Sequence, residues 1–275
     1  MNIFTLGNGF VSSHLPYPKI LDRLIADQQS IRLLLMRYRP DVIVNTLGWG
    51  GVKNIDDCEL NKERTLLSNT IIPILLAIEC EKLDIHLVNI SSGCIFSGES
   101  INLDYDVKDH GWFEGDFANP QSFYSKTKYA CDLAIENLSK TTLLRIRMPI
   151  SNKNSPRNLI NKLRCYNKII DIKNSVTFVD DLCRCIEWVI YNKKYGIFNV
   201  TNSEPLTAVD IMNEYKKYVP EHKFEVISEG ELDNLTIAKR SNCLLNSNKL
   251  KKSGFIMSNS KEALEKCMKE YIKNI

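Results

Sequence analysis

The chain has 275 residues, which is enough for one large domain, or for a domain with a smaller lobe, around a sizeable core. Its 36 Lys and Arg residues against 33 Asp and Glu residues leave a formal charge of +3, so the composition gives no sign of a nucleic-acid partner. No apolar run reaches the roughly 18 residues of a membrane span and no signal peptide is evident, so we expect a cytoplasmic protein with no membrane contact.

Cysteine and histidine give no sign of a metal site. The nine Cys are an odd number without a Cys-x-x-Cys motif, and Cys183 and Cys185 are predicted to point two ways from one helix. The His residues, at positions 14, 86, 110 and 222, are scattered along the chain. We therefore predict reduced thiols and no structural zinc.

The first predicted element is a short apolar strand, Asn2–Leu6, that runs into Gly7-Asn8-Gly9-Phe10-Val11-Ser12. A strand followed by closely spaced glycines is where the pyrophosphate of a dinucleotide can approach backbone N–H groups. The fingerprint is incomplete because Ser12 replaces a third glycine, and a plain strand and turn would look much the same. Pro16 and Pro18 predict that the helix expected next is truncated or absent.

Strands and helices then alternate. The predicted helices are Gln28–Arg37, Glu59–Glu81 (kinked or restarted at Pro73) and Tyr124–Leu138, and the predicted strands are Asp41–Thr46, Ile85–Ser91 and Thr142–Arg147. The acidic stretch Ser97–Asn119 lacks clear periodicity, as lids and disordered loops do. This alternation over the first ~150 residues favours an α/β fold, a Rossmann-type parallel sheet with helices on both faces.

Four motif-bearing loops follow predicted strand ends: Gly7–Ser12, Gly48–Gly51, Ser91–Cys94 and Met148–Pro149. In a parallel sheet these ends meet at one edge, where ligands bind. The predicted helix beginning at Tyr124 joins them there, with Lys128 one turn further on the same face. An ammonium beside a phenol favours the phenolate and lowers the Tyr pKa, which would suit proton transfer, although this spacing alone is weak evidence.

After Pro149 the pattern changes. The predicted helices are Ser155–Tyr166, Val179–Tyr191, Thr207–Tyr218 (with Thr207 as its cap) and Ser260–Ile272, and the predicted strand is Gly196–Val200. We predict a dinucleotide-binding domain over residues 1–150, with 176–200 added to it. Residues 151–175 and 201–275 would form a smaller substrate-binding lobe over the sheet edge.

Two motifs carry a family resemblance. Ser91-Ser92-Gly93-Cys94-Ile95-Phe96, joined to Ser122-Phe123-Tyr124-Ser125-Lys126-Thr127-Lys128, resembles the extended short-chain dehydrogenase/reductases, in the nucleotide-sugar branch of the dTDP-4-dehydrorhamnose reductases. The blocks 144–151, 155–162 and 169–175, together with 238–242 and 248–250, are similar to the epimerase/reductase half of plant-type UDP-rhamnose synthases. The similarity covers nearly the whole chain.

The resemblance implies a two-step reaction on a nucleotide-diphosphate sugar. UDP-4-keto-6-deoxy-D-glucose would be epimerised at C3 and C5, and a nicotinamide hydride would then reduce the C4 ketone to give UDP-L-rhamnose. It implies NADPH as cofactor, with NADH as the alternative, bound by Gly7, Gly9, Phe10, Val11, Tyr124, Lys128 and Met148. The shortened first helix leaves the preference between the two open.

The resemblance also assigns catalytic roles. Ser92 and Tyr124 would supply hydroxyl donors to the C4 oxygen, and Lys128 would polarise Tyr124 and bind the nicotinamide ribose. Cys94 would be the base of the epimerisation, which requires a nearby cation or dipole to favour its thiolate, and Lys162 the partner acid on the opposite face. A strand-end Cys is more often a small buried hydrophobe, and a helical Lys is more often solvated.

The predicted substrate-binding residues are Ser92, Arg157, Asn158, Arg240 and Asn242, donors that suit a diphosphate and a uracil. Surface salt bridges are the alternative role for the two arginines. The remaining cysteines are assigned to packing: Cys58, Cys80, Cys131, Cys165, Cys183, Cys185, Cys243 and Cys267.

Two other functions stay open. One is a reductase that acts on an already epimerised dTDP- or UDP-sugar, for which Cys94 and Lys162 would be unnecessary. The other is a regulatory subunit of the same fold, like the beta subunit of methionine adenosyltransferase. We expect a separate 4,6-dehydratase to supply the 4-keto substrate, and a homodimer formed through the helices at 59–81 and 122–138.

Overall fold

A six-stranded, all-parallel sheet forms the centre of the computed structural model, which describes residues 1–20, 27–100 and 111–275. Its order is β2-β1-β3-β4-β5-β9. The strands are β1 (Ile3–Leu6), β2 (Lys19–Ile20), β3 (Val42–Asn45), β4 (His86–Ser92), β5 (Thr141–Ile146) and β9 (Gly196–Val200). The predicted α/β class with a parallel Rossmann-type sheet is therefore confirmed. Residues 101–110 of the predicted acidic loop, His110 among them, lie outside the described residues.

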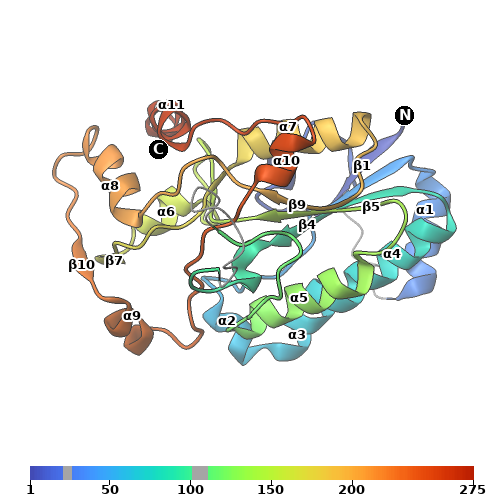
Figure 1. Cartoon of the computed structure of the whole chain (residues 1–275), viewed down its shortest axis with the longest axis horizontal. Helices are drawn as coiled ribbons and strands as arrows, with labels where there is room; N and C mark the ends of the chain where they lie inside the picture. Colours follow the sequence, from blue (N-terminus) through green and yellow to red (C-terminus); the bar gives the residue numbers. More distant parts are fainter. Residues whose placement is uncertain (21–26, 101–110) are drawn as a thin grey trace.

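Helices cover both faces of the sheet (Figure 1). One face carries α1 (Gln28–Tyr38), α4 (Ile72–Lys82) and α5 (Phe123–Ile135), and the other carries α7 (Val179–Tyr191). Successive strand residues point to opposite faces, so Leu143 packs with the first layer and Leu144 with the second. Both faces are buried, which is why the central strands are almost continuously apolar.

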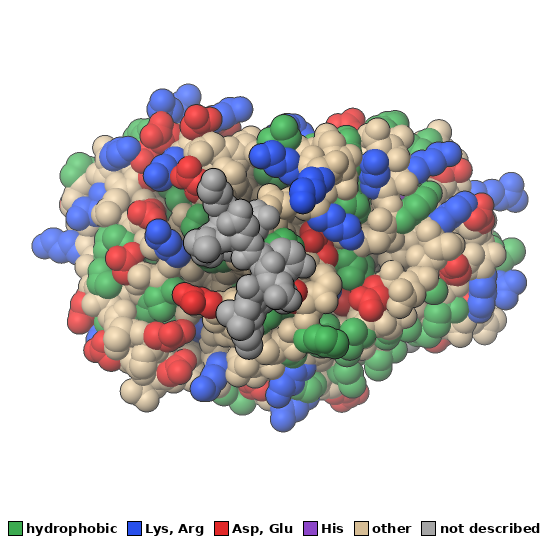
Figure 2. All heavy atoms as spheres, in the orientation of Figure 1, with side chains coloured by type: hydrophobic (Ala, Val, Ile, Leu, Met, Phe, Trp, Pro, Cys, Tyr) green, Lys and Arg blue, Asp and Glu red, His purple; other side chains and the backbone are tan. Residues whose placement is uncertain are grey.

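Charged side chains of both signs are interspersed over the face shown in Figure 2. This agrees with the small formal charge of +3. In the described part of the chain, no helix is both long and apolar enough to cross a bilayer.

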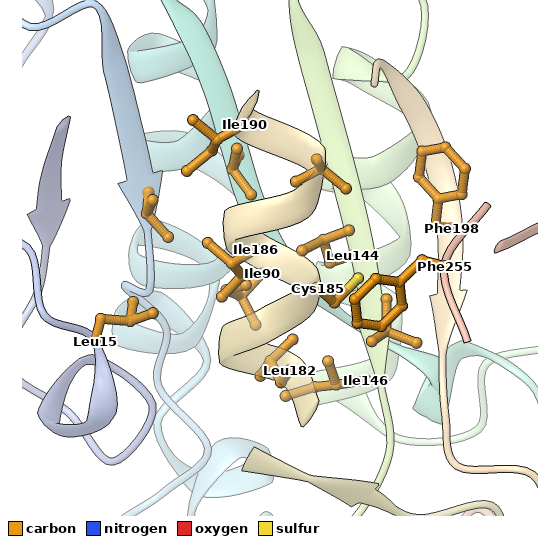
Figure 3. Close-up of a cluster of buried hydrophobic side chains, with 14 of the residues drawn as sticks. Leu15, Ile90, Leu144, Ile146, Leu182, Cys185, Ile186, Ile190, Phe198 and Phe255 are labelled. Carbon is orange, nitrogen blue, oxygen red and sulfur yellow. The ribbon is translucent and has the colours of Figure 1, made fainter. Parts of the chain in front are cut away.

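Helix α7 holds the sheet from its second face. Leu182, Cys185 and Ile186 are fully buried against Leu144 and Ile146 of β5 (Figure 3). Cys183, two positions before Cys185, is only half-buried, so the two sulfurs point different ways, as predicted. This packing fixes the carboxyl end of β5, from which part of the site is built.

The first βα unit is reduced to almost nothing. After β1 the chain makes only a 3-10 turn, Ser12–His14, before the two-residue strand β2. The predicted truncation of this helix is confirmed, and its cause is the pair Pro16 and Pro18, which cannot supply helical N–H donors.

The long helix predicted at 59–81 is instead a chain of short segments. It begins earlier, as α2 (Asp56–Leu60) and α3 (Lys62–Leu66), and continues through a π-helical turn, Leu67–Ile71, into α4. Pro73, where a kink or restart was predicted, lies in the first turn of α4, directly after the π turn. In the π turn, the side chain of Asn69 is buried, and its amide forms hydrogen bonds with the backbone N–H and carbonyl oxygen of Trp49.

The C-terminal elements form two further small sheets and a helical layer. They are β6 (Pro149–Ile150) with β8 (Thr177–Phe178), β7 (Lys168–Ile170) with β10 (Glu225–Ile227), α6 (Leu159–Leu163), α8 (Ala208–Lys216), α9 (Glu229–Leu235), α10 (Asn248–Lys252) and α11 (Ser260–Ile272). Thr207 caps α8 in a capping box, as predicted. The tail also returns to the main sheet, since Phe255 packs against the α7 cluster (Figure 3). The division into two domains stays a prediction.

The helix predicted at Ser155–Tyr166 is much shorter than expected. Only Leu159–Leu163 is α-helical, and Asn158 is its N-cap. Asn158 Oδ1 accepts a hydrogen bond from Ile160 N, so the helix starts after Asn158. Arg157 and Asn158 therefore lie before the helix, and only Lys162 lies on it.

Candidate active site

Four loops meet at the carboxyl ends of the central strands. Gly7 follows β1, Gly48–Gly51 follow β3, Ser92–Cys94 close β4, and Arg147 follows β5. A Cβ built on Gly7, where φ is +112°, would lie 2.7 Å from Thr46 Oγ1, so the loops after β1 and β3 are in direct contact. The strand order reverses between β1 and β3, which makes this edge the binding crevice of such a sheet.

Helix α5 brings Tyr124 and Lys128 to the same edge. The side chain of Ser122 caps its first turn. A Cβ on Gly50 would lie 3.8 Å from a ring carbon of Tyr124, and a Cβ on Gly48 would lie 3.8 Å from Lys128 Nζ. The loop after β3 therefore lies against both side chains.

Tyr124 is protonated more firmly than the sequence suggested. Burial raises its pKa, the neighbouring Cys94 adds to that rise, and only the hydrogen bond with Ser92 and the charge of Arg147 act in the opposite direction. The expected lowering by Lys128 is wrong for this structure. Lys128 is buried, and its Nζ donates to the Ile90 carbonyl oxygen at 3.0 Å. Tyr124 is thus a proton donor at neutral pH.

Cys94 lies beside this pair at the start of a 3-10 turn after β4. Its N–H donates to Ser92 Oγ at 3.2 Å, and its side chain is only partly buried. Arg147 Nη1 donates to Cys94 Sγ at 2.8 Å. The cation that a thiolate at this position requires is therefore present, in the form of a guanidinium from the end of β5.

Arg147 is itself held by two segments far away in sequence. Its Nη2 donates to Asn174 Oδ1 and, at 2.8 Å, to the carbonyl oxygen of Ser241. Nη1 also lies 3.4 Å from Ser241 Oγ. The arginine is 2% exposed. The loop before β8 and the C-terminal tail thus close over the sheet edge through this side chain.

Lys162 lies on α6, close enough to Cys94 for the charge of that thiol to act on its pKa. Burial lowers its pKa, and the charges of Arg157 and Arg240 lower it further, while Cys94 acts in the opposite direction. An amine with a lowered pKa can exchange protons closer to neutral pH than an ordinary lysine can. This is the property that the predicted partner acid of Cys94 needs.

Arg157 crosses from the segment before α6 to the loop after β3. Its guanidinium donates to the carbonyl oxygens of Gly50 and Gly51. It therefore lies against the loop that contacts Tyr124.

Arg240 and Asn242 come from the C-terminal tail and are both engaged in contacts. Arg240 forms a two-pronged ion pair with Asp56, at 2.8 and 3.1 Å, and its charge helps to lower the pKa of that carboxyl against the effect of burial. Asn242 donates to Glu229 Oε1 at 2.6 Å and accepts from Asn174 at 3.0 Å. Contact with a substrate would require these side chains to exchange partners.

Asn158 has a structural role, and its predicted contact with the substrate stays a prediction. Its amide N–H groups donate to the carbonyl oxygens of Ser151 and Lys153, at 2.6 and 2.9 Å, and its Oδ1 caps α6. The side chain is 0% exposed. No donor of this residue is left for a ligand, because the turn before α6 uses both.

Two of the predicted cofactor residues, Gly7 and Gly9, lie on the turn after β1. Gly7 cannot carry a side chain, and a Cβ on Gly9 would meet nothing within 4 Å, so the turn presents bare backbone to open space. Phe10 and Val11 continue this turn, and Met148, which follows β5, has a positive φ of 41°. A left-handed backbone at a bulky residue is a strained arrangement of the kind found at ligand sites.

One histidine braces the glycine turn. His14 hydrogen-bonds the Phe10 carbonyl oxygen at 2.8 Å through Nδ1 and Ser151 Oγ at 2.7 Å through Nε2. Burial lowers its pKa, so the ring is neutral at pH 7. It ties the turn after β1 to the loop after β6.

A second buried polar cluster lies on the opposite side of the β4 and β5 ends. Asp132 of α5 accepts from Ser91 Oγ at 2.5 Å and pairs with Arg145 Nε at 2.9 Å. Arg145 also donates to the Glu114 carbonyl oxygen at 2.9 Å. This cluster fixes α5 to the sheet directly behind the candidate site.

Most other cysteines are packing residues with unreactive thiols. Burial raises the pKa of Cys58, Cys80, Cys131, Cys183, Cys185, Cys243 and Cys267. Cys165 is exposed. Within residues 1–20, 27–100 and 111–275, no cluster of three or more His, Cys, Asp or Glu side chains could hold a metal ion.

The sequence reasoning missed three residues of the pocket: Arg147, Asn174 and Ser241. Arg147 had a usable signal, because a charged residue at the end of a buried strand faces the ligand edge of a parallel sheet. Asn174 and Ser241 had none, since each reaches Arg147 only through the tertiary fold.

A family model described as the RmlD substrate binding domain matches residues 18–273. Over 250 residues, 88% of the chain, the sequence is 34% identical to the Arabidopsis thaliana trifunctional UDP-glucose 4,6-dehydratase/UDP-4-keto-6-deoxy-D-glucose 3,5-epimerase/UDP-4-keto-L-rhamnose-reductase RHM1. The chain spans only 36% of the length of that relative. It is also 32% identical, over 88% of its length and 81% of the relative, to the bifunctional dTDP-4-dehydrorhamnose 3,5-epimerase/dTDP-4-dehydrorhamnose reductase of the same plant.

Among solved structures, the L780 UDP-rhamnose synthase of Acanthamoeba polyphaga mimivirus superposes with a TM-score of 0.87. The two sequences are 26% identical, and the match covers 98% of this chain and 99% of that one. The similarity thus includes the C-terminal segments as well as the sheet.

Proposed function

The chain belongs to the RmlD substrate-binding domain family, and from that membership we propose that it epimerises and then reduces a UDP- or dTDP-linked 4-keto-6-deoxyhexose. It is an NAD(P)H-dependent enzyme, as relatives named dehydrorhamnose reductases imply, and neighbours of the same fold have been solved with NADP or NADPH bound. The observation that carries the proposal is the interaction of Ser92, Cys94, Tyr124 and Lys162 at one sheet edge.

Ser92 and Tyr124 serve the reduction. A nicotinamide cofactor supplies hydride to C4 of the sugar, and the electron pair of the C=O bond moves to the oxygen. Tyr124 delivers the proton that this oxygen needs, and burial, which raises the pKa of Tyr124, keeps the hydroxyl protonated at pH 7. Ser92 donates a second hydrogen bond to the same oxygen.

Cys94 and Lys162 serve the epimerisation. The thiolate of Cys94 removes the proton on a carbon next to the ketone, so that an S–H bond forms and the electron pair moves to the ketone oxygen as an enolate. Lys162 then protonates the carbon from the opposite face and becomes a neutral amine. Transfer of the S–H proton to that amine restores both groups for the second carbon.

We propose the epimerase step over a reductase-only function because of Arg147. A reductase has no use for a thiolate, yet this chain directs a buried guanidinium at Cys94 Sγ. The trifunctional relatives include a 4,6-dehydratase in their names, so we propose that a dehydratase reaction makes the 4-keto substrate.

We also propose a homodimer through α2, α3 and α5. Exposed leucines lie along these elements: Leu60, Leu66 and Leu133, continued by Leu67 and Ile71 of the π turn. Figure 2 shows green side chains, with charged ones among them, toward the lower right edge of the molecule. Such a row of apolar side chains is typical of a subunit interface. Analytical ultracentrifugation of Leu133→Glu tests this, and an unchanged dimer, or a wild-type monomer, would contradict it.

Deuterium exchange tests the epimerase. Wild-type protein incubated with UDP- or dTDP-4-keto-6-deoxyglucose in deuterated water is expected to place deuterium at C3 and C5, detected by NMR. Cys94→Ala is expected to lose this exchange while still reducing pre-epimerised substrate with NADPH. Cys165→Ala, the same change at an exposed cysteine, is the matched control.

The outcomes separate the alternatives. If the wild-type protein reduces its substrate but the product contains no deuterium, the epimerase step is excluded and the reductase-only function remains. Failure of both reactions, with cofactor still bound, would favour a regulatory subunit.

A further inference from the structure

Arg147 is a buried cation whose hydrogen bonds include no carboxylate. Its four recorded acceptors are Cys94 Sγ, Asn174 Oδ1, and the hydroxyl and carbonyl oxygens of Ser241. Its Nε is fully buried and has no partner among the described atoms. Burying a guanidinium costs several kcal/mol unless a negative charge lies beside it.

Thiols stand where a carboxylate would be expected. Burial works against the charged form of Arg147, but its pKa is raised because the charges of Cys243 and Cys94, together with the hydrogen bond to Cys94, outweigh that effect. Tyr124 adds a smaller contribution of the same sign. Two sulfurs therefore lie near this arginine where a carboxylate would be expected, and Cys94 Sγ accepts a hydrogen bond from it.

Of the two sulfurs, Cys94 fits better. Cys243 is buried, lies 3.5 Å from the Gly93 carbonyl oxygen, and has a pKa raised by that burial. Cys94 is more exposed and directly accepts the bond from Nη1 at 2.8 Å. A thiolate at Cys94 would also keep contact with the solvent or substrate that exchanges its proton.

We propose that Arg147 is a positioning residue that holds Cys94 as a thiolate, with this thiolate–guanidinium pair in place of the usual carboxylate partner. The inference rests on the proposed epimerase function, because that function is what a thiolate would serve. The test below does not depend on epimerase activity. The loop at Asn174 and the tail at Ser241 aim the guanidinium, so both segments act on Cys94 through it.

The pair also fits the charge movement of the epimerisation. When Cys94 takes a proton from carbon, the sulfur becomes neutral and the negative charge moves to the enolate oxygen between Ser92 and Tyr124. The charge of Arg147 acts on Tyr124 as well, where it favours a negative oxygen. One fixed cation thus stabilises the charge before and after the proton moves.

The charged and titratable groups around Cys94 come from four elements. Arg147 follows β5, Tyr124 lies on α5, Lys162 lies on α6, and Cys243 lies on the tail. Of these, only Arg147 has a recorded hydrogen bond to Cys94 Sγ among the described residues. Its removal is therefore expected to matter most for the reactivity of the thiol.

Alkylation of Cys94 tests the proposal without any substrate. Iodoacetamide labelling is followed by mass spectrometry of the tryptic peptide 83–108, in which Cys94 is the only cysteine. At about pH 7, Arg147→Met is expected to slow labelling about tenfold or more, since an opposite charge in contact favours ionisation by one to three pH units. At about pH 10, where ordinary thiols ionise, the rates should converge.

Two further variants complete the alkylation test. Arg147→Lys is expected to recover part of the labelling rate at pH 7, because lysine keeps the positive charge but lacks the planar guanidinium with its several N–H donors. Arg184→Met is the matched control, since Arg184 pairs with Asp181 on α7, across the sheet from α5. An unchanged rate at pH 7 in a folded Arg147→Met protein would overturn the proposal.

A second measurement covers the case in which Arg147→Met does not fold. The ultraviolet absorption of the wild-type protein minus that of Cys94→Ser at about pH 7 is expected to contain the band of one thiolate. Absence of the band overturns the proposal. Both tests are independent of the deuterium experiment, so a missing epimerase activity and an un-ionised Cys94 are distinguishable.

Discussion

Arg145 and Arg147 are two buried arginines at the end of the same strand, with opposite surroundings. Arg145 pairs with the carboxylate of Asp132, whose other oxygen accepts from Ser91. Arg147 has a sulfur, two carbonyl-type oxygens and a hydroxyl as acceptors, with its Nε unpaired. The last two residues of β4 are split between these surroundings: Ser91 lies with Arg145, and Ser92 lies with Cys94 and Arg147.

The difference separates a structural polar cluster from a chemical one. In the cluster of Ser91, Asp132 and Arg145 the charges are balanced within the chain, so it fixes α5 and has nothing to offer a ligand. In the cluster of Ser92, Cys94, Tyr124 and Arg147 the balance depends on groups that can gain or lose protons. Changes in the first cluster should cost stability, and changes in the second should cost activity.

The largest expected effect is that of Tyr124→Phe. Loss of the hydroxyl removes the proton donor for the C4 oxygen, so kcat for reduction is expected to fall about 10²–10⁴-fold with cofactor affinity nearly unchanged. Stopped-flow absorbance of NADPH measures the rate, and Tyr129→Phe, on the same helix, is the matched control. An unchanged rate would show that Tyr124 is not the donor.

Lys162→Arg is expected to abolish the exchange at C3 and C5, by about 10²–10⁴-fold, while the reduction of pre-epimerised substrate persists. Arginine keeps the positive charge but cannot lose its proton at any working pH. Because the pKa of Lys162 is lowered, its neutral amine forms at a lower pH than that of an ordinary lysine. In the wild type, the exchange rate measured by NMR should change with pH as the Lys162 amine loses its proton. Normal exchange in Lys162→Arg would rule out the role of Lys162 as the acid.

Arg145→Met and Arg147→Met test the comparison directly through stability. Loss of Arg145 leaves the Asp132 carboxylate buried and unpaired, at an expected cost of about 3–5 kcal/mol. Loss of Arg147 removes a donor from Cys94, Ser241 and Asn174 but leaves no buried carboxylate unpaired, at an expected cost of about 1–3 kcal/mol. Urea denaturation measures both, and equal losses would mean that Arg147 is as structural as Arg145.

Asn158→Ala is expected to have the smallest effect, on stability alone. The change removes the cap of α6 and two donors to buried carbonyl oxygens, which is worth about 1–3 kcal/mol of unfolding free energy. KM for the nucleotide sugar should stay within about twofold once the protein is folded, because no donor of Asn158 is free to bind it. A large rise in KM without loss of stability would support its predicted substrate role.

The sequence predicted most elements of the fold because their signals are local. The parallel strands, α1, α7, α8 and α11 follow from hydrophobic periodicity, and the shortened start follows from Pro16 and Pro18. The long helix at 59–81 was misjudged because a π turn keeps nearly the same apolar pattern while shifting the hydrogen bonds. The helix at 155–166 was overextended because Asn158 was read as an interior residue instead of a cap.

The sequence by itself determined that Tyr124 and Lys128 share a helix face and that Ser92 and Cys94 end a strand, since these follow from the periods of helix and strand. Only the tertiary structure decided what the side chains do. Arg147 meets Ser241, 94 positions away, and Asn174, 27 positions away. Charge and hydrogen-bond balance in a buried site depend on such distant partners, and no local pattern records them.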